Sequence, residues 1–238
     1  PPVFGAAPAY DWVYGSTLVV DASNGLLENI SDIDNTLNVV SGTYVTAQSA
    51  EVAVSSGGGF TYHSTNGHSG ASDSFNYTVQ EGSVTHTVTA TINFVSTRKI
   101  WYVENSSTAG CSGGHENCPF TTLADAENAS ASGDIIYVKS GDGLSTGQDL
   151  GILLKEGQSL VGAGVPLEVE GIVVEVQDLG RIPVLSARES NDGSPVVVLP
   201  PVALGQTIEV QGLVLDGGRM GVGMLSDIAY YPWTYGLV

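Results

Sequence analysis

Two cysteines are the residues whose type and spacing point to chemistry. Cys111 and Cys118 stand in "GCSGGHENCP", separated by six residues that mostly favour turns. This short separation predicts a local disulfide. The alternative, a zinc site, would need more ligands nearby than His115 and Glu116, and the spacing is not that of a zinc knuckle. A disulfide in turn indicates an oxidising, extracytoplasmic compartment.

Four aromatic residues near the end of the sequence are candidates for binding. Tyr230, Tyr231, Trp233 and Tyr235 gather in "AYYPWTYG". Exposed aromatic rings can stack on sugars or anchor an interface. Equally, these rings could cover the last coil of a repetitive fold or begin a further coil.

Two histidines, His63 and His68, lie close together in "HSTNGHSG". They can be read as metal ligands, but neither a cysteine nor a third histidine stands near them in the sequence. We therefore predict a surface loop here.

The first part of the chain has the pattern of β-strands. Residues 10–95 contain short runs in which apolar and polar residues alternate, separated by turn residues. Alternation with a period of two marks strands that bury one face. In residues 75–94, two such runs flank the turn Glu81-Gly82 and predict a hairpin with an apolar face and a threonine-rich face. This is the pattern of a β-sandwich.

A polar break at residues 96–99 separates this part from a second one, and we place the domain boundary after residue 95. Beyond the break, apolar triplets recur between Gly or Asp turns, as in "DIIYVKSGDG" and "GIVVEVQDLG". Their spacing varies, which argues against a strict sequence repeat. They predict a solenoid of parallel strands whose turns differ in length.

One segment of the second part has a helical pattern, with apolar residues at every third position. These positions are Phe120, Leu123, Ala126 and Ala129. Thr121 or Thr122 can serve as the N-cap, and Gly133 can end the helix. An uncovered solenoid end exposes apolar side chains and unpaired backbone groups, so we expect this helix to cover the first coil. The alternative is an irregular surface turn.

The charge of the chain limits its partners. Seven Lys and Arg residues stand against 25 Asp and Glu residues among 238, a formal net charge of −18. Such a chain repels phosphate backbones and anionic lipid headgroups, so nucleic acid is not an expected partner. Membrane insertion is not expected either, because no segment reaches the roughly 18 consecutive apolar residues of a membrane-spanning helix. The first residues lack the regions of a signal peptide, and we interpret the sequence as a mature chain or an excised piece.

Both parts of the chain resemble known families. Residues 1–95 resemble a cadherin-like, Ig-like repeat of large bacterial surface proteins, because "STLVVDASNGLLENISDIDNTLNVVS", "GGGFTYHSTNGHSGASDSFNYTVQEGS" and "HTVTATINFV" follow one another in the family's order. From Ile100 to about Gly223, the phrases "IWYVEN", "PFTTLADA", "GDIIYV" and "GILLKEGQSLVGAG" resemble the start of a right-handed parallel β-helix of the pectin-lyase-like kind. This second likeness specifies architecture rather than function.

The cadherin-like resemblance implies calcium as a cofactor. In "ENISDIDNT", Asp32 and Asp34 match an acidic turn that can hold calcium in such repeats, and Asp73 matches another frequent acidic position. Asn29 and Ser31 stand where the family often has acids, which weakens the site. The alternatives are a plain Asx-rich turn at the first two aspartates and local backbone hydrogen bonds at Asp73.

The β-helix resemblance raises the question of catalysis, because many proteins of that fold cleave acidic polysaccharides with carboxylates and a basic residue. Asp216 and Arg219 in "LVLDGGRMG", with Arg181 and Arg188, come closest to such a set. However, Asp-Gly-Gly is also a common coil turn, and no second carboxylate clusters with it. The chain also has room for only a few coils, so we expect no enzyme.

These observations predict an all-β chain in which an Ig/cadherin-like β-sandwich at residues 1–95 precedes a short right-handed parallel β-helix with an N-terminal capping helix at residues 96–238. The expected function is a non-catalytic structural or adhesive module of a secreted or cell-surface bacterial protein. Its partner would be a surface glycan, a protein or a second copy of the chain. Two alternatives stay open: a filament subunit that assembles through open β edges, and a carbohydrate-binding or polysaccharide-cleaving β-helix protein.

Overall fold

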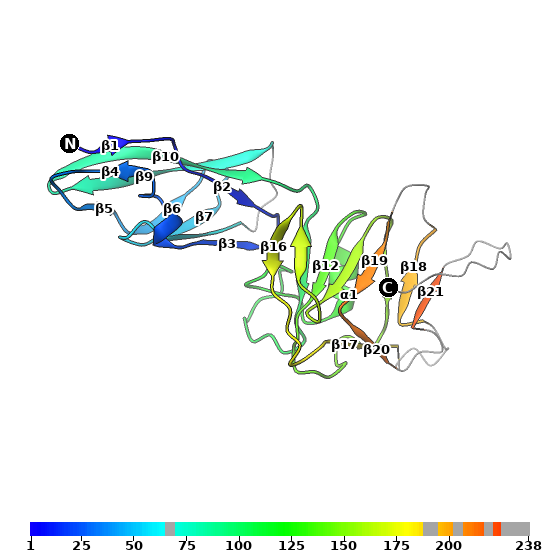
Figure 1. Cartoon of the computed structure of the whole chain (residues 1–238). Helices are drawn as coiled ribbons and strands as arrows, with labels where there is room; N and C mark the ends of the chain where they lie inside the picture. Colours follow the sequence, from blue (N-terminus) through cyan, green and yellow to red (C-terminus); the bar gives the residue numbers. More distant parts are fainter. Residues whose placement is uncertain (65–69, 188–194, 202–206, 217–220, 225–238) are drawn as a thin grey trace.

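The computed structural model describes residues 1–64, 70–187, 195–201, 207–216 and 221–224 (Figure 1). The described residues form mostly β-strands, with one short α-helix and one 3-10 turn at Ala22–Asn24. This confirms the expectation of an all-β fold.

Two four-stranded sheets make up the first part of the chain (Figure 1). One has the spatial order β2 (Ala9–Trp12), β10 (Val84–Phe94), β9 (Ser72–Glu81) and β5 (Leu37–Val39). The other has the order β3 (Thr17–Val20), β8 (Phe60–His63), β7 (Glu51–Val54) and β6 (Gly42–Val45). A small ladder pairs β1 (Val3–Phe4) with β4 (Ile30–Ser31).

The core of this part follows from the alternation in the sequence. Phe75, Tyr77 and Val79 of β9 are buried, and the residues between them are half-buried or exposed. Trp12 and Tyr62 join the same cluster, with their ring centroids 5.2 Å apart. The predicted hairpin is confirmed, because β9 and β10 pair in antiparallel register on either side of the turn.

Three parallel sheets make up most of the second part. The first has the order β11 (Ile100–Val103), β12 (Ile135–Val138), β14 (Ser159–Gly162) and β19 (Glu209–Gln211). The second contains β13 (Ile152–Leu153), β18 (Val197–Leu199) and β21 (Val222–Met224), and the third pairs β17 (Val184–Ser186) with β20 (Val214–Asp216). The chain visits these sheets twice in one order: β14, β17 and β18, then β19, β20 and β21.

Both faces of the first parallel sheet are covered. Ile136 and Val138 of β12 belong to a cluster that includes residues of the other two sheets. Ile135 and Tyr137, on the opposite face, pack in a cluster with the antiparallel hairpin β15 (Leu167–Val169) and β16 (Ile172–Glu175). Burial on both faces explains why the strand reads as an uninterrupted apolar run.

The predicted helix is present as α1 (Leu123–Ala129). The Thr122 side chain accepts a hydrogen bond from the backbone N–H of Asp125, as an N-cap does. Leu123 and Ala126 are buried in the cluster between the parallel sheets. The helix ends earlier than predicted: Ser130 is already extended, and Gly133, with φ +83°, belongs to the turn that leads into β12.

Candidate functional site

Asp32 and Asp34 lie in the loop between β4 and β5. Asp32 Oδ1 accepts hydrogen bonds of 2.8 Å from the backbone N–H groups of Asp34 and Asn35, which is an Asx turn, and these bonds lower the pKa of Asp32. The Asp32 side chain has no exposed surface, and its Oδ2 lies 3.5 Å from the Pro1 nitrogen. The same nitrogen lies 3.9 Å from Glu81 Oε1. The Asp32 and Glu81 carboxylates therefore lie close to one another.

Asp73 is 3% exposed and lies near the start of β9. Its Oδ1 accepts hydrogen bonds from the backbone N–H groups of Gln48, at 3.0 Å, and Ser74, at 2.7 Å. Its Oδ2 accepts from the Tyr62 hydroxyl at 3.3 Å and from the Thr46 hydroxyl. Burial and the nearby charge of Asp73 raise the pKa of Tyr62. The carboxylate thus already has four donors within the chain.

The two acidic positions cannot share an ion. Asp73 and Glu81 lie near opposite ends of β9, and eight residues of extended strand span about 26 Å. Asn35, beside Asp32, donates to Glu81 Oε1 at 2.8 Å, which places Asp32 at the far end from Asp73. Within the described residues, no three or more His, Cys, Asp or Glu side chains group as metal ligands. Calcium binding stays a prediction.

The predicted disulfide is present between Cys111 and Cys118, whose Cα atoms are 5.5 Å apart. The loop that it closes contacts the first part of the chain. Glu116 Oε2 accepts a hydrogen bond of 2.6 Å from the backbone N–H of Thr17, and the Thr17 hydroxyl donates to Asn117 at 3.3 Å. Thr17 begins β3, so the disulfide loop is attached to the edge of the second four-stranded sheet.

Further contacts join the two parts of the chain beside this loop. The Ile100 N–H donates to the carbonyl of Tyr14 at 2.9 Å. Gly15 has φ +100°, and a Cβ at this position would lie 2.3 Å from the carbonyl oxygen of Ile100, so the approach requires glycine. The Lys99 ammonium lies 3.4 Å from the Trp101 ring centroid and 5.1 Å from that of Tyr14. We call these contacts and the disulfide loop the junction.

Two histidines meet at the junction. The ring centroids of His63, at the end of β8, and His115, in the disulfide loop, are 5.9 Å apart, with the rings at 82°. Nδ1 of each ring is buried without a hydrogen-bond partner. Burial lowers the pKa of both residues, to about 4 for His115, where the Lys99 charge adds to the effect. The prediction of a surface loop is wrong for His63, which is half-buried in a strand, and His68 lies outside the described residues.

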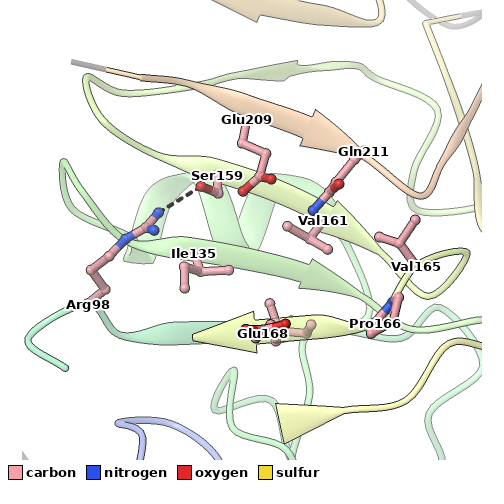
Figure 2. A pocket seen from close by; sticks show the side chains of 10 residues that line it. Arg98, Ile135, Ser159, Val161, Val165, Pro166, Glu168, Glu209 and Gln211 are labelled. Atoms are coloured by element: carbon pink, nitrogen blue, oxygen red, sulfur yellow. Dashed lines mark hydrogen bonds between the residues drawn. The ribbon is translucent and has the colours of Figure 1, made fainter. Parts of the chain in front are cut away.

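A pocket of about 390 Å³ lies on the face of the first parallel sheet that carries the β15–β16 hairpin (Figure 2). Its lining residues are Arg98, Ile135, Ser159, Val161, Val165, Pro166, Leu167, Glu168, Glu209 and Gln211. Arg98 is held at one end, because its Nη2 donates to the Ser159 hydroxyl and its Nε to the Gly133 carbonyl, both at 2.7 Å. Glu168 and Glu209 are exposed. The pocket therefore offers hydrogen-bond donors and acceptors to a polar ligand.

The other sequence candidates are only partly described. Asp216 ends β20, opposite Ser186 of β17, and Arg181 donates to the Gly141 carbonyl at 2.9 Å. Arg188, Arg219 and the predicted binding residues Tyr230, Tyr231, Trp233 and Tyr235 lie outside the described residues.

Sequence reasoning missed the pocket residues. Arg98 stands in the polar break at residues 96–99, which by itself indicates only a domain boundary, and the two glutamates lie far apart in the sequence. A signal was available in "IEVQG", where Glu209 and Gln211 flank Val210 and so share one face of a strand. What the sequence does not show is that Glu168, from a hairpin inserted between coils, lies beside them.

The comparisons with known proteins bear on the first part of the chain. Residues 2–95 match the family model of a cadherin-like domain. The match covers β1 to β10 and supports the resemblance stated for residues 1–95. Neither the curated proteins nor the solved structures contain a match to this chain. In the described ranges, no helix has both the length and the apolar character needed to cross a membrane.

Proposed function

We propose that the chain is a non-catalytic structural or adhesive module of a secreted or cell-surface bacterial protein. The observation that carries the proposal is the cadherin-like match at residues 2–95, since such domains suggest an extracellular adhesive or structural role. The disulfide between Cys111 and Cys118 supports an extracytoplasmic location.

The second part of the module, residues 96–238, is the capped start of a right-handed parallel β-helix. Its support is the order in which the chain visits three parallel sheets twice, because only stacked coils return each strand beside its counterpart one coil earlier. The right hand follows from the strong preference for right-handed connections between parallel strands. On this proposal the sandwich, residues 1–95, and the β-helix are separate domains held together by the junction.

Adhesion between copies is tested with beads that carry the purified chain on their surface. Their aggregation is scored in calcium and again in chelator, and light scattering gives the solution mass under the same conditions. Aggregation or ordered multimers support adhesion or filament assembly. A chain that stays monomeric and leaves the beads dispersed contradicts self-association and leaves a foreign glycan or protein as the partner.

Calcium is the cofactor that this proposal assigns, with Asp32 and Glu81 as its ligands. The support is the fully buried Asp32 side chain and Asn35, which donates from its backbone N–H to Asp32 Oδ1 and from its side chain to Glu81 Oε1 and so brings the two carboxylates together. Calcium prefers carboxylate oxygens. We expect added calcium to raise the thermal unfolding temperature of the wild type and of the Asp21→Asn control, but not of Asp32→Asn or Glu81→Gln. A calcium-induced shift that survives both substitutions contradicts the assignment.

The pocket favours a second candidate function, the binding or cleavage of a polysaccharide. Arg98, Glu168 and Glu209 form the set of a basic residue and carboxylates that such an activity needs. Glycan binding would be measured by calorimetry on the wild type, Glu209→Gln and the exposed control Glu170→Gln, and cleavage by release of reducing ends. Reducing ends released by the wild type but not by Glu209→Gln would replace the non-catalytic proposal with an enzymatic one.

A further inference from the structure

Two buried imidazole nitrogens lack partners at the junction, and this is unusual because buried polar atoms in folded proteins are nearly always hydrogen-bonded. The atoms are Nδ1 of His63 and Nδ1 of His115. His115 is 8% exposed, so water has little access to its ring. An unpaired buried nitrogen of this kind calls for an explanation, and one explanation is a ligand that the chain alone does not supply.

The separation of the two rings suits a shared metal ion. A nitrogen ligand lies about 2.0–2.1 Å from zinc, so the centroid of an imidazole ring lies about 3.2 Å from the ion, and two rings on one ion have centroids about 5–6.5 Å apart. The observed distance between the centroids of His63 and His115 is 5.9 Å. The distance between the two rings is therefore compatible with one ion bound between them.

We propose that His63 and His115 form a binding site for a divalent transition-metal ion such as Zn²⁺, Ni²⁺ or Cu²⁺, which links the sandwich to the disulfide loop. Imidazole is a preferred ligand of these ions, whereas calcium takes oxygen ligands. The site is distinct from the carboxylate pair Asp32 and Glu81. No third His, Cys, Asp or Glu groups with the pair in the described part of the chain, so the proposed site has two protein ligands.

The surroundings of the pair favour a cation. The Glu116 carboxylate follows His115 in the chain and brings a negative charge to the junction. The same carboxylate is held by the backbone N–H of Thr17 and cannot move away freely. The Lys99 charge opposes the site, although its ammonium is directed at the ring of Trp101.

The test is calorimetric titration of the whole chain, freed of metal by chelator, with ZnCl₂ and with NiCl₂. The variants His63→Phe and His115→Phe keep an aromatic ring in the junction and remove the ring nitrogens. The control is His86→Phe, at a half-buried histidine that lies beside Glu81 instead of in the junction. We expect one ion per chain for the wild type and the control. Either junction variant should bind at least ~10-fold more weakly.

Two further readouts keep the test decisive if a variant folds poorly. The Cu²⁺ complex of the wild type should show two equivalent nitrogen couplings by electron paramagnetic resonance. Zinc should also raise the unfolding temperature of the wild type, because the ion binds only when the junction is formed. The absence of saturable binding by the wild type overturns the proposal, as does unchanged affinity in either junction variant or a copper spectrum with fewer than two nitrogen ligands.

Discussion

Replacing Asp73 separates two roles that a buried carboxylate can play, that of a calcium ligand and that of a hydrogen-bond acceptor. In Asp73→Ala, the N–H groups of Gln48 and Ser74 lose their acceptor, as do the hydroxyls of Thr46 and Tyr62. The hydroxyls can rotate toward other acceptors, but the backbone donors cannot. An unsatisfied buried donor costs about 1–3 kcal/mol, and because these two backbone donors are only partly buried we expect a loss of about 2–4 kcal/mol in the free energy of unfolding.

The variant Asp73→Asn should lose less, about 1–2 kcal/mol, because one amide oxygen still serves the backbone donors while the NH₂ group donates to the two hydroxyl oxygens. The measurement is urea unfolding followed by tryptophan fluorescence, since Trp12 is buried in the same core. Asp21→Ala, at an exposed aspartate of the same domain, is the control. All four proteins are measured in calcium and in chelator.

If Asp73 acts only as a hydrogen-bond acceptor, the four proteins should have the same order of stability in calcium and in chelator. If Asp73→Ala lowers the free energy of unfolding by less than about 1 kcal/mol, the four hydrogen bonds to Asp73 do not stabilise the domain as we infer. If its effect appears in calcium and vanishes in chelator, Asp73 is a metal ligand and its interpretation as a structural residue is wrong.

Three other substitutions test separate parts of the structure. Cys111→Ser opens an eight-residue loop and should lower the free energy of unfolding by about 2–3 kcal/mol, measured against wild type kept oxidised. Leu123→Ala, in the helix that covers the sheets, should cost about 2–5 kcal/mol, whereas exposed Asn128→Ala should be near neutral. Burial raises the pKa of Glu175, so folding favours its protonated form and stability falls as pH rises above 4.5. Glu175→Gln should therefore stabilise at pH 7 but not at pH 4, and equal gains at both values, or a gain in exposed Glu170→Gln, would count against this account.

The sequence predicted local structure well wherever a period was clear. Alternation marked the buried face of β9, and the three-residue spacing around Leu123 marked α1 with Thr122 as its cap. Both patterns arise from the residues of one element and its immediate core. The end of the helix was placed too late because Gly133, a plausible terminator by type, serves a turn three residues beyond the C-cap.

Contacts between distant segments could not be predicted in the same way. Thr17 meets Glu116 across 99 positions, and His63 meets His115 through the folding of both domains. Nothing in the composition of "HSTNGHSG" indicates that its first histidine ends a strand at the junction. The pocket could not be predicted from the sequence for the same reason, since Glu168 and Glu209 come together only when coils stack around an inserted hairpin.

The parallel pairing of β2 with β10 determines how the sandwich would resist a pull on its two ends. The two strands run in the same direction, with Ala9 opposite Thr91 and Trp12 opposite Phe94. After the short β1, they are the strands by which the chain enters and leaves the sandwich. A pull on the two ends therefore slides one strand along the other, and the hydrogen bonds between them must break together rather than one by one. Such shear loading makes a sandwich strong against stretching, a useful property in a protein that would hold a cell to a moving partner.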